Sequence, residues 1–119
     1  MIRILVVEDR VDFRLAFVAM LEGQQELEVV SQAGSLAEAR TMLEGVDVAL
    51  LDRGLPDGDG LELIGALREV NPLARVFVIS STAEMIHPTD AIVAGADGVI
   101  DKLDTPERGF AAIREEGGG

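Results

Sequence analysis

Short apolar runs alternate with longer amphipathic segments along this chain of 119 residues. The runs are continuous rather than alternating, which is typical of strands buried on both faces of a parallel sheet. They predict five strands, at residues 2–7, 27–32, 47–51, 75–79 and 98–101.

The segments between the runs carry apolar residues at helical spacing and recognisable helix ends. Ser35 and Glu38 form a capping-box pattern, Gly23 is a helix stop, and Asn71-Pro72 ends another helix. The predicted helices cover residues 11–22, 36–44, 61–70, 88–94 and the stretch from 106 onward. Strands that alternate with helices in this way predict an α/β fold, a parallel sheet with helices on both faces.

Polar side chains stand at or just past the carboxyl ends of these strands. They are Glu8, Asp9, Asp52, Ser80 and Lys102. Ligands of such sheets bind beyond the carboxyl ends of the strands, so we expect these residues to share one pocket. Three acids, a hydroxyl and an ammonium suit a divalent metal and a phosphoryl group.

Four of these residues also have a simpler interpretation. Glu8 and Asp9 could cap the first helix, where carboxylates are favourable. Ser80 and Lys102 could be ordinary residues at strand ends. If the three acids do meet, each like-charged neighbour raises the pKa of a carboxyl group.

Composition restricts the class of protein further. The chain has 10 basic and 22 acidic residues, a net charge of −12, which disfavours binding to nucleic acid or to an anionic membrane. It has no cysteine, which excludes disulfides and thiolate metal sites and fits the cytoplasm. We expect one domain at residues 1–116 and a glycine tail at 117–119.

The ordered set of motifs resembles the response regulator receiver domain, the phosphoacceptor module of two-component signalling. The likeness rests on five segments: Val6-Val7-Glu8-Asp9, Leu50-Leu51-Asp52, Leu55-Pro56-Asp57-Gly58-Asp59-Gly60-Leu61, Ser80, and Gly95-Ala96-Asp97-Gly98 leading to Lys102. It covers nearly all of the chain from Arg3 to Arg114. The resemblance implies a flavodoxin-like five-stranded sheet of order 2-1-3-4-5.

The resemblance also implies a magnesium-dependent phosphoacceptor. Asp52 would take a phosphoryl group from a phosphohistidine, as a carboxylate nucleophile. Asp9 and Asp52 would bind Mg2+ directly, Glu8 directly or through water, and Gly54 through its backbone carbonyl. Magnesium favours such hard oxygen ligands.

Two further roles follow from the same resemblance. Lys102 would pair with a phosphoryl oxygen, and Ser80 would be the hydroxyl that moves toward the phosphoryl group, with Thr82 a competitor for that role. Val99 stands where many receivers carry a Tyr or Phe that swings inward.

The implied partners are a histidine kinase or a histidine phosphotransfer protein. A C-terminal output domain, a downstream protein and a phosphorylation-dependent homodimer are further partners. Such a domain is a signalling phosphoacceptor rather than an enzyme. The alternative is a degenerate receiver that acts only as a protein-interaction module. A small hydrolase or flavin-binding protein on the same fold lacks support, because no phosphate-cradling glycine loop follows the first strand.

Overall fold

A computed structural model describes residues 1–80, 92, 94–102 and 106–117, with side chains of the last helix described at 109–114. Its main sheet has five parallel strands in the order β2-β1-β3-β6-β7. These are β1 (Ile2–Val7), β2 (Leu27–Ala33), β3 (Val48–Asp52), β6 (Arg75–Ser80) and β7 (Gly98–Asp101). The five predicted strands and their order are confirmed, and the fold is flavodoxin-like.

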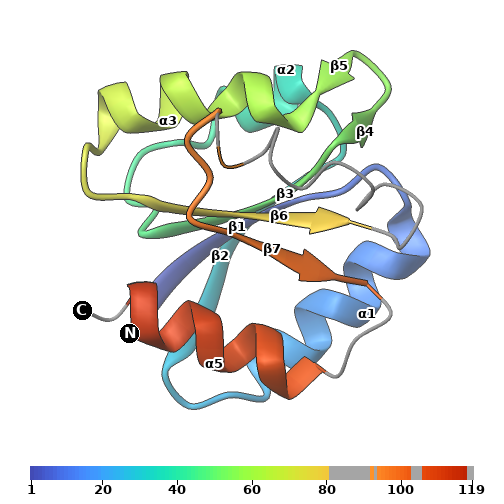
Figure 1. Ribbon diagram of the computed structural model, residues 1–119. Coiled ribbons are helices and arrows are strands. Elements are labelled where there is room, and N and C mark those ends of the chain that lie inside the picture. Colours follow the sequence, from blue (N-terminus) through green and yellow to red (C-terminus); the bar gives the residue numbers. More distant parts are fainter. Residues whose placement is uncertain (81–91, 93, 103–105, 118–119) are drawn as a thin grey trace.

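Helices cover both faces of this sheet (Figure 1). α1 (Val11–Glu22) and α5 (Pro106–Gly117) lie on one face, and α2 (Leu36–Ala39) and α3 (Leu63–Val70) on the other. Successive strand residues point to opposite faces, so β1 sends Ile4 and Val6 toward α1 and α5, and Leu5 and Val7 toward α2 and α3. Both faces of the central strands are therefore buried, which explains their continuous apolar sequences.

The second helix is much shorter than predicted. The expected helix to residue 44 is wrong, because α2 ends at Ala39 with Arg40 as its C-cap. The Thr41 hydroxyl donates to the carbonyl of Glu38, and the backbone N–H groups of Thr41 and Met42 also reach back only three residues. A hydroxyl that binds a local carbonyl competes with the helical pattern, and here the chain continues in turns.

Several expectations lie outside the described residues. They include the predicted helix at 88–94, except for Ile92 and Ala94, and the hydroxyl of Thr82. α5 includes Gly117, so the boundary between the domain and a glycine tail stays a prediction. Among the described helices, none is long and apolar enough to cross a membrane.

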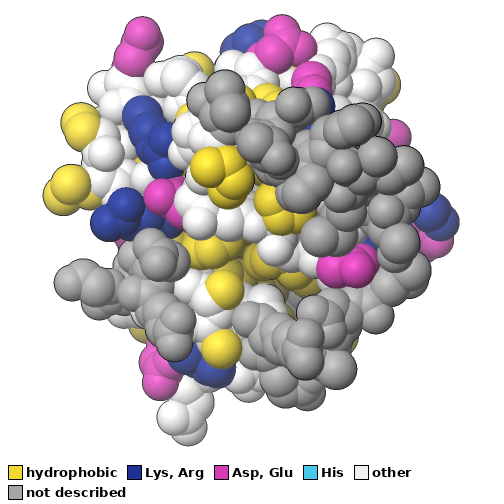
Figure 2. Space-filling view, viewed as in Figure 1, with side chains coloured by type: hydrophobic (Ala, Val, Ile, Leu, Met, Phe, Trp, Pro, Cys, Tyr) yellow, Lys and Arg dark blue, Asp and Glu magenta, His cyan; other side chains and the backbone are white. Residues whose placement is uncertain are grey.

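β7 forms an edge of the sheet and keeps its apolar side chains half-buried. Val99 packs against the core beneath α2 and α3, and Ile100 against the core beneath α1 and α5. Figure 2 shows hydrophobic side chains gathered in the middle of this face, with most of the visible charged side chains around its rim. Val99 therefore contributes a short branched side chain to the packing at the edge of the sheet.

The loop after β3 is closed by a small hairpin and a 3-10 turn. β4 (Gly54–Leu55) pairs with β5 (Gly58–Asp59), and η1 (Gly60–Glu62) follows at once. A Cβ at Gly60 would lie 2.1 Å from the carbonyl oxygen of Asp52, so only glycine permits this approach. The contact brings the loop back against the end of β3.

The same loop also caps α2. The Asp57 carboxylate accepts hydrogen bonds from the backbone N–H groups of Leu36 at 2.8 Å and Ala37 at 3.0 Å. These bonds lower the pKa of Asp57, because they favour the charged form. The Asp57 carboxylate therefore connects the loop after β3 to the start of α2.

Substitution of that carboxylate should make the protein less stable above acid pH. Asp57→Asn should lower the urea midpoint at pH 7, because the amide offers the two N–H groups a weaker acceptor than the carboxylate. A carboxyl group whose pKa is lower in the folded than in the unfolded state stabilises the protein at pH values above the unfolded pKa. This stabilisation is lost as the pH falls through the folded pKa, so the wild type and Asp57→Asn should become more alike in acid. Urea unfolding between pH 3 and pH 7 measures this, with the exposed Glu69→Gln as the charge-matched control. Equal effects of the two substitutions at neutral pH would show that Asp57 does not hold α2.

Candidate functional site

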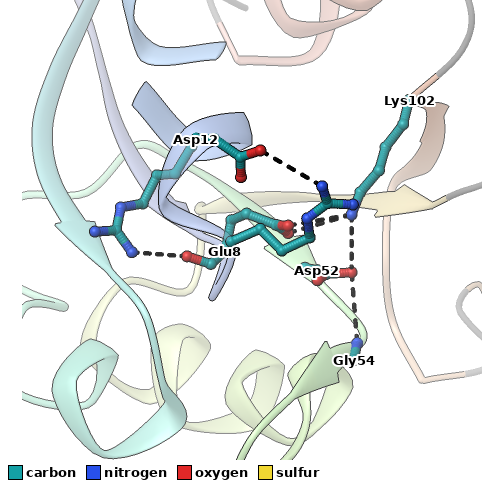
Figure 3. A network of polar contacts seen from close by, with 7 residues as sticks. Glu8, Asp12, Asp52, Gly54 and Lys102 are labelled. Carbon is teal, nitrogen blue, oxygen red and sulfur yellow. Dashed lines mark hydrogen bonds and ion pairs between the residues drawn. The ribbon is translucent and has the colours of Figure 1, made fainter. Parts of the chain in front are cut away.

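The strand ends bring the predicted site residues to one edge of the sheet (Figure 3). Glu8 directly follows β1, Asp52 ends β3, Ser80 ends β6, and Lys102 directly follows β7. Pairing of Asp52 with Ile79, and of Ser80 with Asp101, sets these ends level with one another. The strand ends therefore meet at one edge as predicted, and the side chains of Glu8, Asp52 and Lys102 are in contact there.

Three carboxylates form the acidic part of the site. Ligand atoms of Glu8, Asp9 and Asp52 all lie within 4.8 Å of one another. Glu8 is fully buried and Asp52 is 4% exposed, whereas Asp9 is exposed. Helix α1 has Arg10 as its N-cap without a side-chain cap bond, so the interpretation of Glu8 and Asp9 as helix caps is wrong.

The Lys102 ammonium lies against this cluster. Its Nζ atom is 3.3 Å from both carboxylate oxygens of Glu8 and 3.6 Å from Oδ1 of Asp52. Figure 3 shows the lysine side chain reaching from the end of β7 to the two acids. One cation therefore faces two carboxyl groups that the fold has removed from water.

The fold changes the protonation of Glu8. Burial, and next the hydrogen bond and the charge of Asp52, raise the pKa of Glu8 from 4.5 to about 7, although Lys102 acts in the opposite direction. The expected repulsion between carboxylates is thus present, but burial is the larger cause. Near neutral pH, Glu8 is therefore protonated in part of the molecules instead of carrying a permanent negative charge.

The two remaining predicted residues border the same site. The Gly54 N–H donates to Oδ1 of Asp52 at 3.4 Å, beside the acids. Ser80 is 2% exposed, and its carbonyl accepts a hydrogen bond from the Lys102 N–H at 2.8 Å. Metal binding by the Gly54 carbonyl and movement of the Ser80 hydroxyl stay predictions.

Two further side-chain contacts at the site were not predicted from the sequence. The Phe13 ring lies with its centroid 4.8 Å from the Lys102 ammonium. Arg53 pairs with Asp59 through Nη2 at 2.9 Å and Nε at 3.2 Å, which clamps the loop after the acceptor strand. The contact of Phe13 with Lys102 joins parts of the chain that are far apart in the sequence, so no local pattern predicts it. The second was foreseeable only as two opposite charges in one turn-rich loop.

The donor set fits magnesium. All three clustered groups offer hard carboxylate oxygens, and one of them is open to solvent, where a hydrated ion can enter. Because a ligand carboxylate must be deprotonated, binding at neutral pH would also draw the proton from any Glu8 that coordinates directly.

Comparison with known proteins identifies the family. The family model described as the response regulator receiver domain matches residues 4–114. The chain belongs to this family. Receiver domains are signalling modules of two-component response regulators, and they bind Mg2+ at an acidic pocket of the kind formed here by Glu8, Asp9 and Asp52.

Relatives of this receiver include longer regulators and separately solved domains. The DNA-binding transcriptional activator DevR/DosR of Mycobacterium tuberculosis is 36% identical in an alignment of 121 positions, which covers 100% of this chain and 56% of that protein. The chain thus spans about half the length of this relative.

Two solved structures show the same fold. The receiver domain of the putative regulator NarL from Mycobacterium tuberculosis is 28% identical, has a TM-score of 0.84, and is covered to 97%, against 99% of this chain. A Burkholderia pseudomallei response regulator, solved with a phosphorylated aspartic acid, a calcium ion and citrate, is 26% identical with a TM-score of 0.76. That match covers 93% of this chain and 65% of the other.

The raised pKa of Glu8 predicts how the metal-free receiver responds to pH. The folded state binds more protons than the unfolded state between pH 4.5 and about 7, so stability should fall as the pH rises through this range. Glu8→Gln removes the titration, and it should be more stable than the wild type above pH 7 by at most about 3 kcal/mol. Below pH 4.5 the difference should vanish. Urea unfolding in EDTA, with Glu69→Gln as control, measures both profiles, and parallel profiles for wild type and Glu8→Gln would contradict the assignment.

Proposed function

We propose that this receiver accepts a phosphoryl group on Asp52 with Mg2+ and then changes an output surface. The single observation that carries the proposal is the placement of the Lys102 ammonium 3.6 Å from Oδ1 of Asp52, within a cluster of three carboxylates. A nucleophilic carboxylate, a cation for the phosphoryl oxygens and hard metal ligands then occupy one small space.

The reaction would be a phosphoryl transfer from the histidine of a kinase. A carboxylate oxygen of Asp52 forms a bond to phosphorus, the bond between phosphorus and the imidazole nitrogen breaks, and its electron pair stays on the imidazole. Lys102 would turn from its two carboxylates to a phosphoryl oxygen, as a compact charge on a flexible stem. The buried setting of Asp52, at 4% exposure, strengthens that attraction.

The metal would be held by two of the three clustered acids and one backbone carbonyl. We assign Asp9, Asp52 and the Gly54 carbonyl as direct ligands. Glu8 is fully buried and already in contact with Lys102 through both oxygens, which favours binding through a water molecule over direct coordination. When bound, Mg2+ supplies positive charge that offsets the negative charge of the carboxylates and the phosphoryl oxygens.

The response would begin at Ser80. Its backbone carbonyl accepts a hydrogen bond from the backbone N–H of Lys102, so movement of its hydroxyl toward the phosphoryl group occurs beside the cation that meets the same group. Val99, on the neighbouring strand, is β-branched and stiff, and it cannot swing a ring between exposed and buried positions. We therefore propose a switch without the aromatic movement that many receivers use.

The partners follow from the same proposal. A histidine kinase or a histidine phosphotransfer protein would donate the phosphoryl group in the cytoplasm. A C-terminal output domain, a downstream protein or a phosphorylation-dependent homodimer would receive the signal, since DevR/DosR and similar relatives are longer transcriptional regulators. The net charge of −12 opposes direct binding of this domain to nucleic acid.

Phosphorylation of Asp52 is directly testable. We expect acetyl phosphate to add one phosphoryl group to the wild type in Mg2+ and none in EDTA, and Asp52→Asn to abolish the modification. Intact-protein mass spectrometry measures the added mass. Asp12→Asn, an exposed acid in the first turn of α1, is the control and should remain competent.

Two results would contradict the proposal. Modification that persists in Asp52→Asn would assign the phosphoryl group to another residue. A wild type that takes no phosphoryl group from acetyl phosphate, phosphoramidate or a histidine kinase would favour the degenerate interaction module.

A further inference from the structure

An aromatic ring faces the Lys102 ammonium on the side of helix α1. The ammonium lies 4.8 Å from the centroid of Phe13, within the range of a cation–π contact. Phe13 is half-buried, and the lysine side chain is only 16% exposed. The ring therefore meets a cation that has lost most of its water, where such a contact is strongest.

The position of that ring is itself determined by the core. Phe13 and Phe17 lie one helical turn apart on α1, and their rings are stacked with centroids 5.7 Å apart and planes 14° apart. Phe17 is 7% exposed and belongs to the core between the sheet, α1 and α5. Through this stack, the hydrophobic core sets the orientation of a ring at the edge of the site.

The ammonium thus has neighbours of two kinds. Both oxygens of Glu8 lie at 3.3 Å and Oδ1 of Asp52 at 3.6 Å, while the Phe13 ring lies at 4.8 Å. The carboxylates attract the charge, and both would compete with an incoming phosphoryl group for it. The ring also attracts the charge through its negative face, but it carries no net charge and stays in place when the ammonium changes its anionic partner.

We propose that Phe13 is a positioning residue, which holds the Lys102 ammonium above the acceptor carboxylate during phosphoryl transfer. The inference rests on the proposed function, because it concerns how Lys102 meets the phosphoryl group at Asp52. A lysine side chain is flexible, and a fixed surface beside its ammonium reduces the number of conformations that must be lost in reaching the phosphoryl oxygen.

A simpler possibility is that Phe13 only fills space beside Phe17. The two roles differ in what they require of the side chain. Packing accepts a leucine of similar bulk, whereas holding the ammonium requires an aromatic face. Tyrosine keeps that face, and it should rescue what leucine loses.

The phosphorylation rate separates these roles. With phosphoramidate and Mg2+, Phe13→Leu should react about 2- to 5-fold more slowly than the wild type, the loss of a partly exposed cation–π contact. Phe13→Tyr should react at about the wild-type rate. Phe17→Leu keeps the Phe13 ring but removes the stack that orients it, so its rate should lie between those of Phe13→Leu and the wild type. Urea unfolding of each variant verifies that the fold is kept.

A second measurement reads the contact without any reaction. The Hε protons of Lys102 should be shifted upfield by the Phe13 ring current in the NMR spectrum of the wild type and of Phe13→Tyr. The shift should be lost in Phe13→Leu, and Mg2+ affinity should be equal in all three proteins. Unshifted Hε protons in the wild type, or equal rates for Phe13→Leu and the wild type, would overturn the proposal.

The proposed function and the role of Phe13 can be contradicted separately. A wild type that takes no phosphoryl group overturns the proposed function, whatever the spectrum of Lys102. A wild type that is phosphorylated, but no faster than a folded Phe13→Leu, overturns the role of Phe13 alone.

Discussion

Two carboxyl groups are buried beside one ammonium, and the remainder of the site is arranged around this imbalance of charge. Removal of a carboxylate from water costs of the order of several kcal/mol unless partners compensate it. Lys102 compensates part of that cost for Glu8 and Asp52, and Glu8 meets another part through a pKa raised to about 7. The site is therefore least favourable when metal-free and fully ionised, and a divalent cation would relieve it.

The fold holds this cluster together against its own repulsion. Parallel pairing sets the ends of β1, β3, β6 and β7 level, and a core on each face of the sheet fixes those strands. Three separate interactions hold the loop after Asp52 in place. They are the close contact of Gly60 with the Asp52 carbonyl, the Arg53–Asp59 ion pair, and the hydrogen bonds of Asp57 to the start of α2. The stability that the core, the strand pairing and these loop contacts supply allows mutually repelling carboxylates to stay together at one edge of the sheet.

Much of this arrangement is predictable from the sequence, for a definite reason. A continuous apolar sequence predicts a strand that is buried on both faces of the sheet. An acid or lysine at the carboxyl end of such a strand then lies at the edge where ligands bind, as Asp52 and Lys102 do. Local patterns are weaker guides where side chains compete for the backbone, as Thr41 does at the end of α2. Local patterns do not predict contacts that only the tertiary fold creates, such as that of Phe13 with Lys102.

The central claim is that this charge cluster is completed by a metal and a phosphoryl group together. The direct measurement is the melting temperature at pH 7.5 in EDTA, in Mg2+, and in Mg2+ with beryllofluoride, a phosphoryl mimic, for the wild type and Asp9→Asn. We predict that Mg2+ raises the melting temperature of the wild type, that beryllofluoride raises it further only with Mg2+, and that Asp9→Asn loses both increments. Equal melting temperatures of the wild type in EDTA and in millimolar Mg2+, with or without beryllofluoride, would contradict the account.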